Sequence, residues 1–521
     1  MLNLPHARRW LEFDAMIAII VVIASVGWMN VTDPDFFWHL KNGEIILESG
    51  SLFTVDIYSH TAKDTPIQIT GWLFDVAIAW IHQNFGFAGI RVFAACFIFA
   101  TWLAVYKCAK LYVVRSQTAA LLGLFSIVLL APLIAIRPNL FTHAAFAWVL
   151  FSALYLCRHH NFRALLWVIP LFIIWPYFHF GFAAGLLLLV LFVVAAWMDS
   201  FIPLSDNQPI QHLKNPFLIG IIISCALAAL LNNYGATIYN DLFEMTVRAG
   251  TSPVSEWKSP DFKPPFQKIL LVSLFIYILL LFVQKRSDSW LLFIIPAALL
   301  WSLLTAQRNQ GFWAIILPVF VAIQVAGTAG TYQHAENKLS ERLERNDPIP
   351  RITYYLNGIL ILLTLIVVAV RAPEVTKKHF TNAGALLPVE ATDFLLNEVA
   401  DGKLFNRYGS GGYLIWRTYP KFKVFVDGRY APYTDQIIED ALYILAGRPD
   451  ALNLLSKYEV EIAFAENDTA LFHMLVTSAM FRLVYSDSKH SVFVLDNEKF
   501  KNLRSVAPQN DKNTIELESN T

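Results

Sequence analysis

Long apolar runs separated by short polar breaks fill the chain up to residue 371. A transmembrane helix needs about 20 consecutive, mostly apolar residues. Runs of roughly this length are expected to span a bilayer at residues 13–30, 88–110, 117–136, 140–157, 163–178, 180–198, 216–232, 267–284, 290–306, 311–328 and 353–371. The pattern therefore predicts a polytopic α-helical membrane protein with about eleven transmembrane helices.

The composition supports this interpretation. Hydrophobic residues make up 56% of the 521 residues and charged residues 15%, against about 25% charged residues in an average soluble protein. A water-soluble fold cannot bury so much apolar side chain, so lipid must be the solvent of most of the chain. The 40 basic and 40 acidic residues cancel, and the chain therefore lacks the basic surplus with which nucleic-acid-binding proteins meet phosphates.

Charge placement predicts the orientation in the membrane. The stretch from Gly71 to Phe85 is short for a span and contains Asp75. If this stretch lies at the interface, the basic breaks all fall on the side of the N-terminus, as the positive-inside rule requires. These breaks are Arg8/Arg9, Lys107/Lys110/Arg115, Arg158/Arg163, Lys285/Arg286 and Lys338/Arg342/Arg345/Arg351. We then expect a multi-pass protein of the inner (plasma) membrane with a cytoplasmic N-terminus and a periplasmic or extracellular C-terminus.

The same topology defines the domains. Residues 1–371 form the transmembrane domain, with outer loops at residues 31–70 and 234–265, and residues 372–506 form a polar extracytoplasmic domain. In that domain strand-like and helix-like runs alternate, which predicts an α/β layer. The strand-like runs are Lys423–Val426, Glu461–Phe464 and Ser491–Leu495, and the helix-like runs are Asp435–Leu445, Ala451–Lys457 and Leu471–Ala479. Residues 507–521 are polar and lack aromatic residues, which predicts a disordered tail.

Two carboxylates, Asp33 and Asp35, follow the first span and precede Trp38 and His39. Asp33 is suited to cap a helix that begins at Pro34, because Asp is a favoured N-cap residue and Pro a favoured first helical residue. A cap does not explain the second aspartate. In the alternative interpretation, one carboxylate is a general base toward an acceptor hydroxyl, or holds a cation that bridges a lipid phosphate.

Asp33-Pro34-Asp35 with Trp38-His39-Leu40 and Gly43, followed by Thr54–Thr61, resembles the first outer loop of GT-C membrane glycosyltransferases. That superfamily includes protein mannosyltransferases, aminoarabinose transferases and the catalytic subunits of oligosaccharyltransferases; uncharacterised bacterial multispan proteins with a soluble C-terminal region are closest in pattern. The resemblance implies a GT-C-like membrane domain, a polyprenyl-phosphate- or diphosphate-linked sugar donor, and a catalytic role for Asp33 or Asp35. It leaves the choice between these two aspartates open.

Further polar residues interrupt the apolar pattern on the outer face. Arg137 and Arg308 either reach to lipid headgroups or grip the phosphate of a lipid carrier, for which a planar guanidinium is well suited. Glu256, in Ser255-Glu256-Trp257, resembles a short segment of oligosaccharyltransferase subunits and is a candidate acceptor or metal ligand, or else a solvated loop carboxylate. His39 and His179 are candidates for the same role. His179 lies where the bacterial relatives have an Asn-x-His-Gly turn, but Tyr177 replaces the Asn, which favours a structural histidine.

Three of these residues are also candidate metal ligands. If Mg²⁺ or Mn²⁺ takes part, its candidate ligands are Asp33, Asp35 and Glu256, because carboxylate oxygens are the ligands these hard cations prefer. The sequence does not decide whether a metal is required.

Two glycine-containing segments stand out in the C-terminal domain. Asn406–Tyr413 has the sequence NRYGSGGY, and Val426–Tyr430 has the sequence VDGRY. A glycine-rich turn that opens a helix can hold a phosphate on its amides, but the spacing matches neither a dinucleotide-binding nor a Walker motif. Tight strand-to-helix turns are the favoured interpretation. Asp427 and Arg429 are close enough to pair at the surface, where the pair would contribute little stability.

Together these features predict a membrane glycosyltransferase that moves a sugar from a polyprenyl-phosphate-linked donor to a glycan, lipid or protein acceptor on the extracytoplasmic face. The carboxylate would take the acceptor's proton while arginines or a divalent ion neutralise the leaving phosphate. Two alternatives stay open: a transporter or flippase of a lipid-linked sugar, and a non-catalytic membrane scaffold. Transporters usually place polar groups near the bilayer midplane and contain repeated halves, whereas here the polar positions gather at one rim.

Overall fold

The computed structural model describes residues 17–22, 33–113, 116–204, 216–249, 255–283, 289–328, 359, 387–429 and 431–507. By its contacts the chain forms two compact units. One consists of Met1–Met29 and Phe85–Pro373, and the other of Asn30–Asn84 and Glu374–Thr521. We call them the helical unit and the α/β unit.

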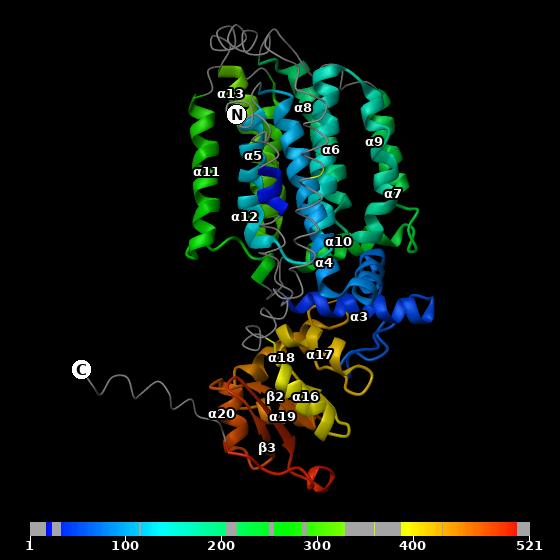
Figure 1. Ribbon diagram of the computed structural model, residues 1–521, viewed down its shortest axis with the longest axis vertical. Coiled ribbons are helices and arrows are strands. Elements are labelled where there is room, and N and C mark those ends of the chain that lie inside the picture. Colours follow the sequence, from blue (N-terminus) through cyan, green and yellow to red (C-terminus); the bar gives the residue numbers. More distant parts are fainter. Residues whose placement is uncertain are drawn as a thin grey trace, which may run out of the picture. The chain divides into compact units, whose positions relative to one another are not determined.

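The helical unit consists mainly of apolar helices (Figure 1). Its helices are the second part of α4 (Trp72–Lys110), α5 (Ser116–Leu130), α6 (Asn139–His159), α7 (Val168–Phe178), α8 (Phe182–Phe201), α9 (Pro216–Ala228), α10 (Thr237–Ala249), α11 (Pro265–Val283), α12 (Leu291–Thr305) and α13 (Gln310–Thr328). The exception is the more polar α10, which lies in the segment that the sequence assigned to the outer loop 234–265. Short 3₁₀ helices lie between them: η1 (Ala131–Leu133), η2 (Phe162–Leu165), η4 (Ser255–Trp257) and η5 (Gln307–Asn309). Within the described residues, the expected spans from 88–110 to 311–328 are therefore largely helical.

The doubtful stretch from Gly71 to Phe85 forms the first part of α4. At Gly86 the backbone is not helical, with φ 61° and ψ −162°. Glycine reaches this positive φ without the steric cost that a Cβ brings. The break separates this stretch from the apolar helix that follows, and the boundary between the two compact units falls beside it, at Asn84/Phe85.

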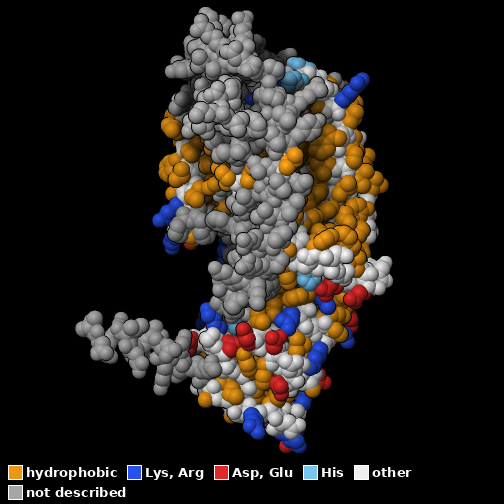
Figure 2. Space-filling view, viewed as in Figure 1, with side chains coloured by type: hydrophobic (Ala, Val, Ile, Leu, Met, Phe, Trp, Pro, Cys, Tyr) orange, Lys and Arg blue, Asp and Glu red, His pale blue; other side chains and the backbone are white. Residues whose placement is uncertain are grey.

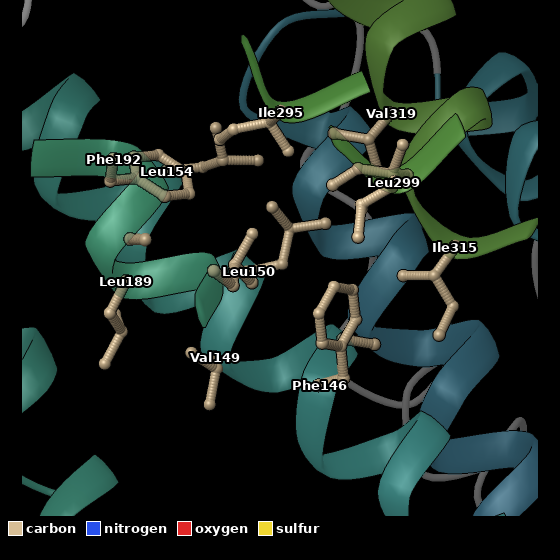
Figure 3. Close-up of a cluster of buried hydrophobic side chains, with 14 of the residues drawn as sticks. Phe146, Val149, Leu150, Leu154, Leu189, Phe192, Ile295, Leu299, Ile315 and Val319 are labelled. Carbon is tan, nitrogen blue, oxygen red and sulfur yellow. The ribbon is translucent and has the colours of Figure 1, made fainter. Parts of the chain in front are cut away.

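The helical unit has an apolar core and an apolar outer surface. In the core, α6 contributes Phe146, Val149, Leu150 and Leu154, and these face side chains of α8, α12 and α13 (Figure 3). The facing side chains include Leu189, Phe192, Ile295, Leu299, Ile315 and Val319. Hydrophobic side chains also gather on the outside of these helices (Figure 2); Phe282 is 84% exposed and Trp301 is 72% exposed. Exposed apolar surface of this kind is stable in lipid and not in water.

Among the described residues, four helical segments are long and apolar enough to cross a membrane by length and composition: Trp72–Lys110, Ser116–Leu133, Asn139–His159 and Phe182–Phe201. Shorter apolar helices accompany them, so the chain is a mostly helical membrane protein. The count of about eleven spans stays a prediction. Of the expected spans 13–30 and 353–371, only residues 17–22 and 359 lie within the described part of the chain.

The α/β unit is built around a four-stranded sheet in the order β1-β2-β4-β3. Its strands are β1 (Leu404–Phe405), β2 (Ile462–Glu466), β3 (Phe481–Ser486) and β4 (His490–Leu495). β1 and β2 are parallel, and the other pairs are antiparallel. The helices are α3 (Pro34–Ser49), the first part of α4, α16 (Val389–Glu398), α17 (Gly411–Thr418), α18 (Asp435–Leu445), α19 (Ala451–Lys457) and α20 (Ala470–Thr477), with 3₁₀ helices η6 (Tyr408–Ser410) and η7 (Glu498–Phe500).

The segment after the first span packs into this unit. Tyr58 belongs to the same apolar cluster as Leu404 and Ile462, and α3 packs against α17. Val424 pairs with Ser59 as a parallel bridge: its N–H donates to the Tyr58 carbonyl at 3.0 Å, and its carbonyl accepts from the His60 N–H at 3.1 Å. The sequence assigned residues 31–70 to the membrane domain as a loop, whereas contacts group residues 30–84 with the C-terminal residues. The expected boundary at 371/372 lies outside the described residues.

Candidate active site

Asp33 and Asp35 lie at the start of α3 and are both half-buried. Asp33 is the N-cap residue: its Oδ1 accepts from the backbone N–H of Asp35 at 3.0 Å, and Pro34 occupies the first turn. The predicted cap is therefore present. The Asp35 Oδ1 accepts from the Trp38 indole at 3.4 Å. Each carboxylate is thus held by a contact to its own helix.

The two glycine-containing segments of the C-terminal part lie against this turn. A Cβ on Gly412 would come within 2.1 Å of the Pro34 carbonyl oxygen, and a Cβ on Gly428 within 1.7 Å of the Asp35 Oδ1. Real Cβ atoms do not approach other atoms so closely, so these positions require glycine for close packing. The segment Asn406–Tyr413 forms the turn that opens α17. Both segments therefore position the Asp33-Pro34-Asp35 turn.

A buried hydrogen-bond network fixes the rest of α3. The His39 Nδ1 and the Asp75 Oδ1 are 2.6 Å apart, and the Asn42 Nδ2 donates to the Asp75 Oδ2 at 2.9 Å. The Tyr58 hydroxyl donates to the Asn42 Oδ1 at 2.8 Å. Asp75 is completely buried, and a buried carboxylate is stable only with such partners. The His39 imidazole, a candidate acceptor or metal ligand from sequence, is engaged with Asp75.

A second network joins the N-terminal segment to the C-terminal part. The Arg429 guanidinium donates to the Asp56 Oδ1 at 2.6 Å and to the two Asp427 carboxylate oxygens at 2.8 and 2.6 Å. The Tyr433 hydroxyl also donates to Asp427. Asp56 and Asp427 are both 0% exposed. The expected Asp427–Arg429 pair exists, but the expectation that it lies at the surface is wrong, because Asp56 and Tyr433 close over it.

Burial and charge shift the pKa values of these groups. Burial works against the charged form of Arg429, but the carboxylates of Asp427 and Asp56 outweigh it, and the pKa of Arg429 lies well above its usual value. Burial raises the pKa of Tyr433 and of Tyr58 well above the ordinary value of 10.0. Arg429 therefore stays charged at physiological pH, and both phenols stay neutral.

In the helical unit, the structure brings together three other predicted residues. The Arg137 Nη1 and the Glu256 Oε1 are 2.7 Å apart. The Arg308 guanidinium lies over the Trp257 ring, 3.9 Å from its centroid, and η4 and η5, which carry Glu256 and Arg308, are in contact. Burial lowers the pKa of Arg308, while the Glu256 charge raises it and the Arg137 charge lowers it. We call Arg137, Glu256 and Arg308 the arginine–glutamate cluster.

His179 has a local structural role. It ends α7, its Nδ1 is 2.9 Å from the Thr142 hydroxyl, and it accepts from the Gly181 N–H at 3.1 Å. The Trp175 indole donates to the same Thr142 hydroxyl at 2.9 Å. These contacts agree with the interpretation of His179 as a structural histidine, which the replacement of Asn by Tyr177 favoured in the sequence.

The predicted site residues are thus divided between the units. Asp33, Asp35 and His39 belong to the α/β unit, and Arg137, Glu256, Arg308 and His179 to the helical unit. Within the described residues, no three His, Cys, Asp or Glu side chains form a group that could hold a metal ion. The described side chains therefore do not form a built site for Mg²⁺ or Mn²⁺.

Sequence reasoning missed Asn42, Asp56 and the structural role of Asp75. Asp75 carried a signal, since a carboxylate within an apolar helix requires a partner. Asn42 and Asp56 carried none, because their partners depend on the pairing of segments far apart in the chain: Asp56 and Arg429 are separated by 373 positions.

Comparison with known proteins supports the fold. No protein-family model matches the chain, and no curated protein does. Among solved structures, an apo oligosaccharyltransferase from Archaeoglobus fulgidus matches with a TM-score of 0.53 at 11% identity, over 93% of this chain and 74% of that one. ArnT from Cupriavidus metallidurans, bound to undecaprenyl phosphate, matches with a TM-score of 0.51 at 13% identity, over 95% of this chain and 98% of that one.

This chain has the GT-C fold. A third GT-C structure, AglB from Archaeoglobus fulgidus in complex with an inhibitory peptide and a dolichol-phosphate, matches with a TM-score of 0.51 at 10% identity, over 87% of this chain and 69% of that one. The predicted resemblance is thereby confirmed as structural similarity. At identities this low, the comparison establishes the GT-C fold alone.

Replacing Arg429 by Met should destabilise the α/β unit. The substitution keeps an unbranched apolar stem but leaves the buried carboxylates of Asp427 and Asp56 without their cation, which costs about 3–5 kcal/mol of unfolding free energy. Thermal unfolding of the purified protein should therefore begin at a lower temperature. Lys501→Met is the control, because Lys501 pairs with Glu498 at an exposed position where a pair contributes little. An unchanged melting temperature for Arg429→Met would contradict this account of the network.

The α/β unit should also lose stability on acidification through His60. His60 contacts the Leu404 carbonyl at 3.0 Å, and burial lowers its pKa from 6.5 to about 4. Because the unfolded state binds this proton more readily, His60 destabilises the fold increasingly as the pH falls from 6.5 towards 4, by on the order of 2–3 kcal/mol at the low end. Above pH 6.5 His60 is neutral in both the folded and the unfolded state, so it no longer lowers the stability of the fold.

Melting temperatures between pH 7 and pH 4.5 test this. The fall in melting temperature should be smaller in His60→Gln than in the wild type. His473→Gln, which replaces an exposed histidine, is the control and should show the same fall as the wild type. Equal pH dependence in His60→Gln and the wild type would show that His60 does not titrate in this way.

Proposed function

We propose that this protein is a membrane glycosyltransferase that moves a sugar from a polyprenyl-phosphate-linked donor to an acceptor on the extracytoplasmic face. The observation that carries the proposal is the GT-C fold, which extends over 95% of this chain in the match to ArnT. The structures it resembles include one bound to undecaprenyl phosphate and one in complex with dolichol-phosphate. A donor with an isoprenoid tail also suits a protein whose helices expose apolar side chains.

The proposed reaction is a single displacement at the anomeric carbon of the donor sugar. The acceptor hydroxyl oxygen forms the new bond to that carbon, and the bond from the carbon to the phosphate oxygen breaks. Asp33 or Asp35, as general base, takes the hydroxyl proton, and the polyprenyl phosphate leaves with the bonding electron pair. Such a displacement inverts the anomeric configuration.

The arginine–glutamate cluster supports the second half of this chemistry. A guanidinium can bind a phosphate bidentately and stabilise the charge that develops on the leaving oxygen. Glu256 orients Arg137, and Trp257 orients Arg308, so both guanidinium groups are held in position before a ligand binds. We propose that Arg137 and Arg308 bind the donor phosphate, with Glu256 as their orienting carboxylate.

Charge-removing substitutions at the two aspartates test the proposed base. Asn is as good an N-cap residue as Asp, so Asp33→Asn removes the charge and retains the cap of α3. Replacing the residue that acts as base should slow transfer about 10²–10⁴-fold, and the double variant Asp33→Asn/Asp35→Asn should be inactive. The measurement is release of polyprenyl phosphate from a radiolabelled polyprenyl-phosphate sugar by protein in nanodiscs, with solubilised cell-envelope material as acceptor.

Asp64→Asn is the matched control. Asp64 lies in the same segment, its side chain is 71% exposed, and its backbone has a φ of 63°, which Asn tolerates well. This variant should release the lipid phosphate at the wild-type rate. Wild-type release by the double variant, in protein that melts at the wild-type temperature, would refute the proposed base.

A further inference from the structure

A cavity of about 560 Å³ lies in the α/β unit. Part of its polar lining comes from Arg407 and Ser410, which follow β1. The rest comes from Glu466 at the end of β2, Thr469 just after it, and His490 at the start of β4. β1 and β2 are parallel neighbours, so their carboxyl ends meet at the same edge of the sheet. In α/β sheets this is the edge at which ligands bind, and the volume is within the range of small-molecule sites.

His490 gives independent evidence of a ligand. The residue is 4% exposed, and within the described part of the chain its Nδ1 has no hydrogen-bond partner. The Asp487 Oδ1 is 4.0 Å from this nitrogen, which is beyond hydrogen-bond distance. A buried polar atom without a partner is costly. Because His490 lines the cavity, a ligand bound there can supply the missing hydrogen bond.

The charges of the lining balance. Arg407 forms an ion pair with Glu466, and the two side chains are 51% and 38% exposed. Burial lowers the pKa of His490, so its imidazole is neutral at physiological pH. The lining thus offers N–H donors from Arg407 and a carboxylate acceptor from Glu466. The hydroxyl oxygens of Ser410 and Thr469 add acceptor capacity, because their protons are donated to the backbone carbonyls of Arg407 and Glu466.

This set of groups favours a neutral ligand with many hydroxyl groups. Each hydroxyl both donates and accepts, so it can satisfy a guanidinium, a carboxylate and an imidazole in turn. Because Arg407 and Glu466 are paired with each other, this lining carries no surplus charge that would attract an anion or a cation. Apolar walls from Leu445, Phe464 and Leu471 suit the C–H face of a sugar ring. Saccharides combine these properties.

The cavity also adjoins the proposed base. Pro34, between Asp33 and Asp35, is part of the lining, and the Gly409-Ser410 turn of the lining opens α17, which packs on α3. We propose that this cavity binds a neutral saccharide, the sugar portion of the glycosyl acceptor. The identification of that saccharide as the acceptor rests on the proposed function; the binding of a saccharide does not.

Saturation-transfer-difference NMR on the full-length protein in nanodiscs tests the binding. The probes are three neutral trisaccharides: mannotriose, maltotriose and triacetylchitotriose. We expect at least one to bind the wild type, and to bind at least about tenfold more weakly to Glu466→Gln and to Arg407→Gln, each of which removes a charged hydrogen-bonding group from the lining. Glu459→Gln is the matched control, because Glu459 pairs with Lys403 outside this cavity and its replacement should leave binding unchanged.

The possible failures are distinguishable. If none of the three probes binds, if binding is the same in the two cavity variants as in the wild type, or if inorganic phosphate displaces the saccharide competitively, the cavity is not a neutral saccharide site. If a trisaccharide binds as predicted, also to Asp33→Asn/Asp35→Asn, but the wild type releases no polyprenyl phosphate, the site stands and the proposed transferase function fails. If release proceeds and no probe binds, the function stands and this proposal fails.

Discussion

The buried guanidinium of Arg429 is the interaction on which the α/β unit depends. It lies between Asp56, from the segment that follows the first expected span, and Asp427, from the C-terminal part. Neither carboxylate is exposed, so neither can remain charged without the cation. The N-terminal segment and the C-terminal part must therefore fold together. The Arg429 guanidinium also lies over the Tyr58 ring, 4.8 Å from its centroid. The Tyr58 hydroxyl is hydrogen-bonded to Asn42, and Asn42 and His39 both contact Asp75.

This constraint gives the C-terminal domain a role in positioning the two carboxylates. Gly412 and Gly428 leave room for the Asp33-Pro34-Asp35 turn. The Asp427–Arg429 pair holds the segment that follows α3 through Asp56. The domain is therefore part of the proposed catalytic machinery, because it determines where the carboxylates lie. The cavity beside Pro34 belongs to the same compact unit as the proposed base. The residues proposed to bind the donor phosphate belong to the other unit.

The sequence predicted the helices well and the tertiary contacts poorly, for physical reasons. Apolar runs specify membrane helices because lipid is the solvent, and local patterns were enough to give α18 and α19 their observed bounds. Lys423–Val426, expected as a strand, is not a strand of the sheet: Val424 forms an isolated parallel bridge with Ser59 instead. β3 was missed, since its burial does not alternate. The cap at Asp33 is local and was predicted; the burial of Asp427 and Arg429 depends on Asp56 and was not.

The central claim is that the C-terminal domain positions the two carboxylates for glycosyl transfer, and Gly412→Ala tests it most directly. The new Cβ would collide with the Pro34 carbonyl, 2.1 Å away, and would shift the peptide between Asp33 and Asp35 without altering any proposed catalytic group. Displacement of a catalytic group by about 1 Å can cost 10²-fold in rate. The account predicts that Gly412→Ala binds polyprenyl phosphate like the wild type but transfers sugar at least about tenfold more slowly. Transfer at the wild-type rate would contradict it.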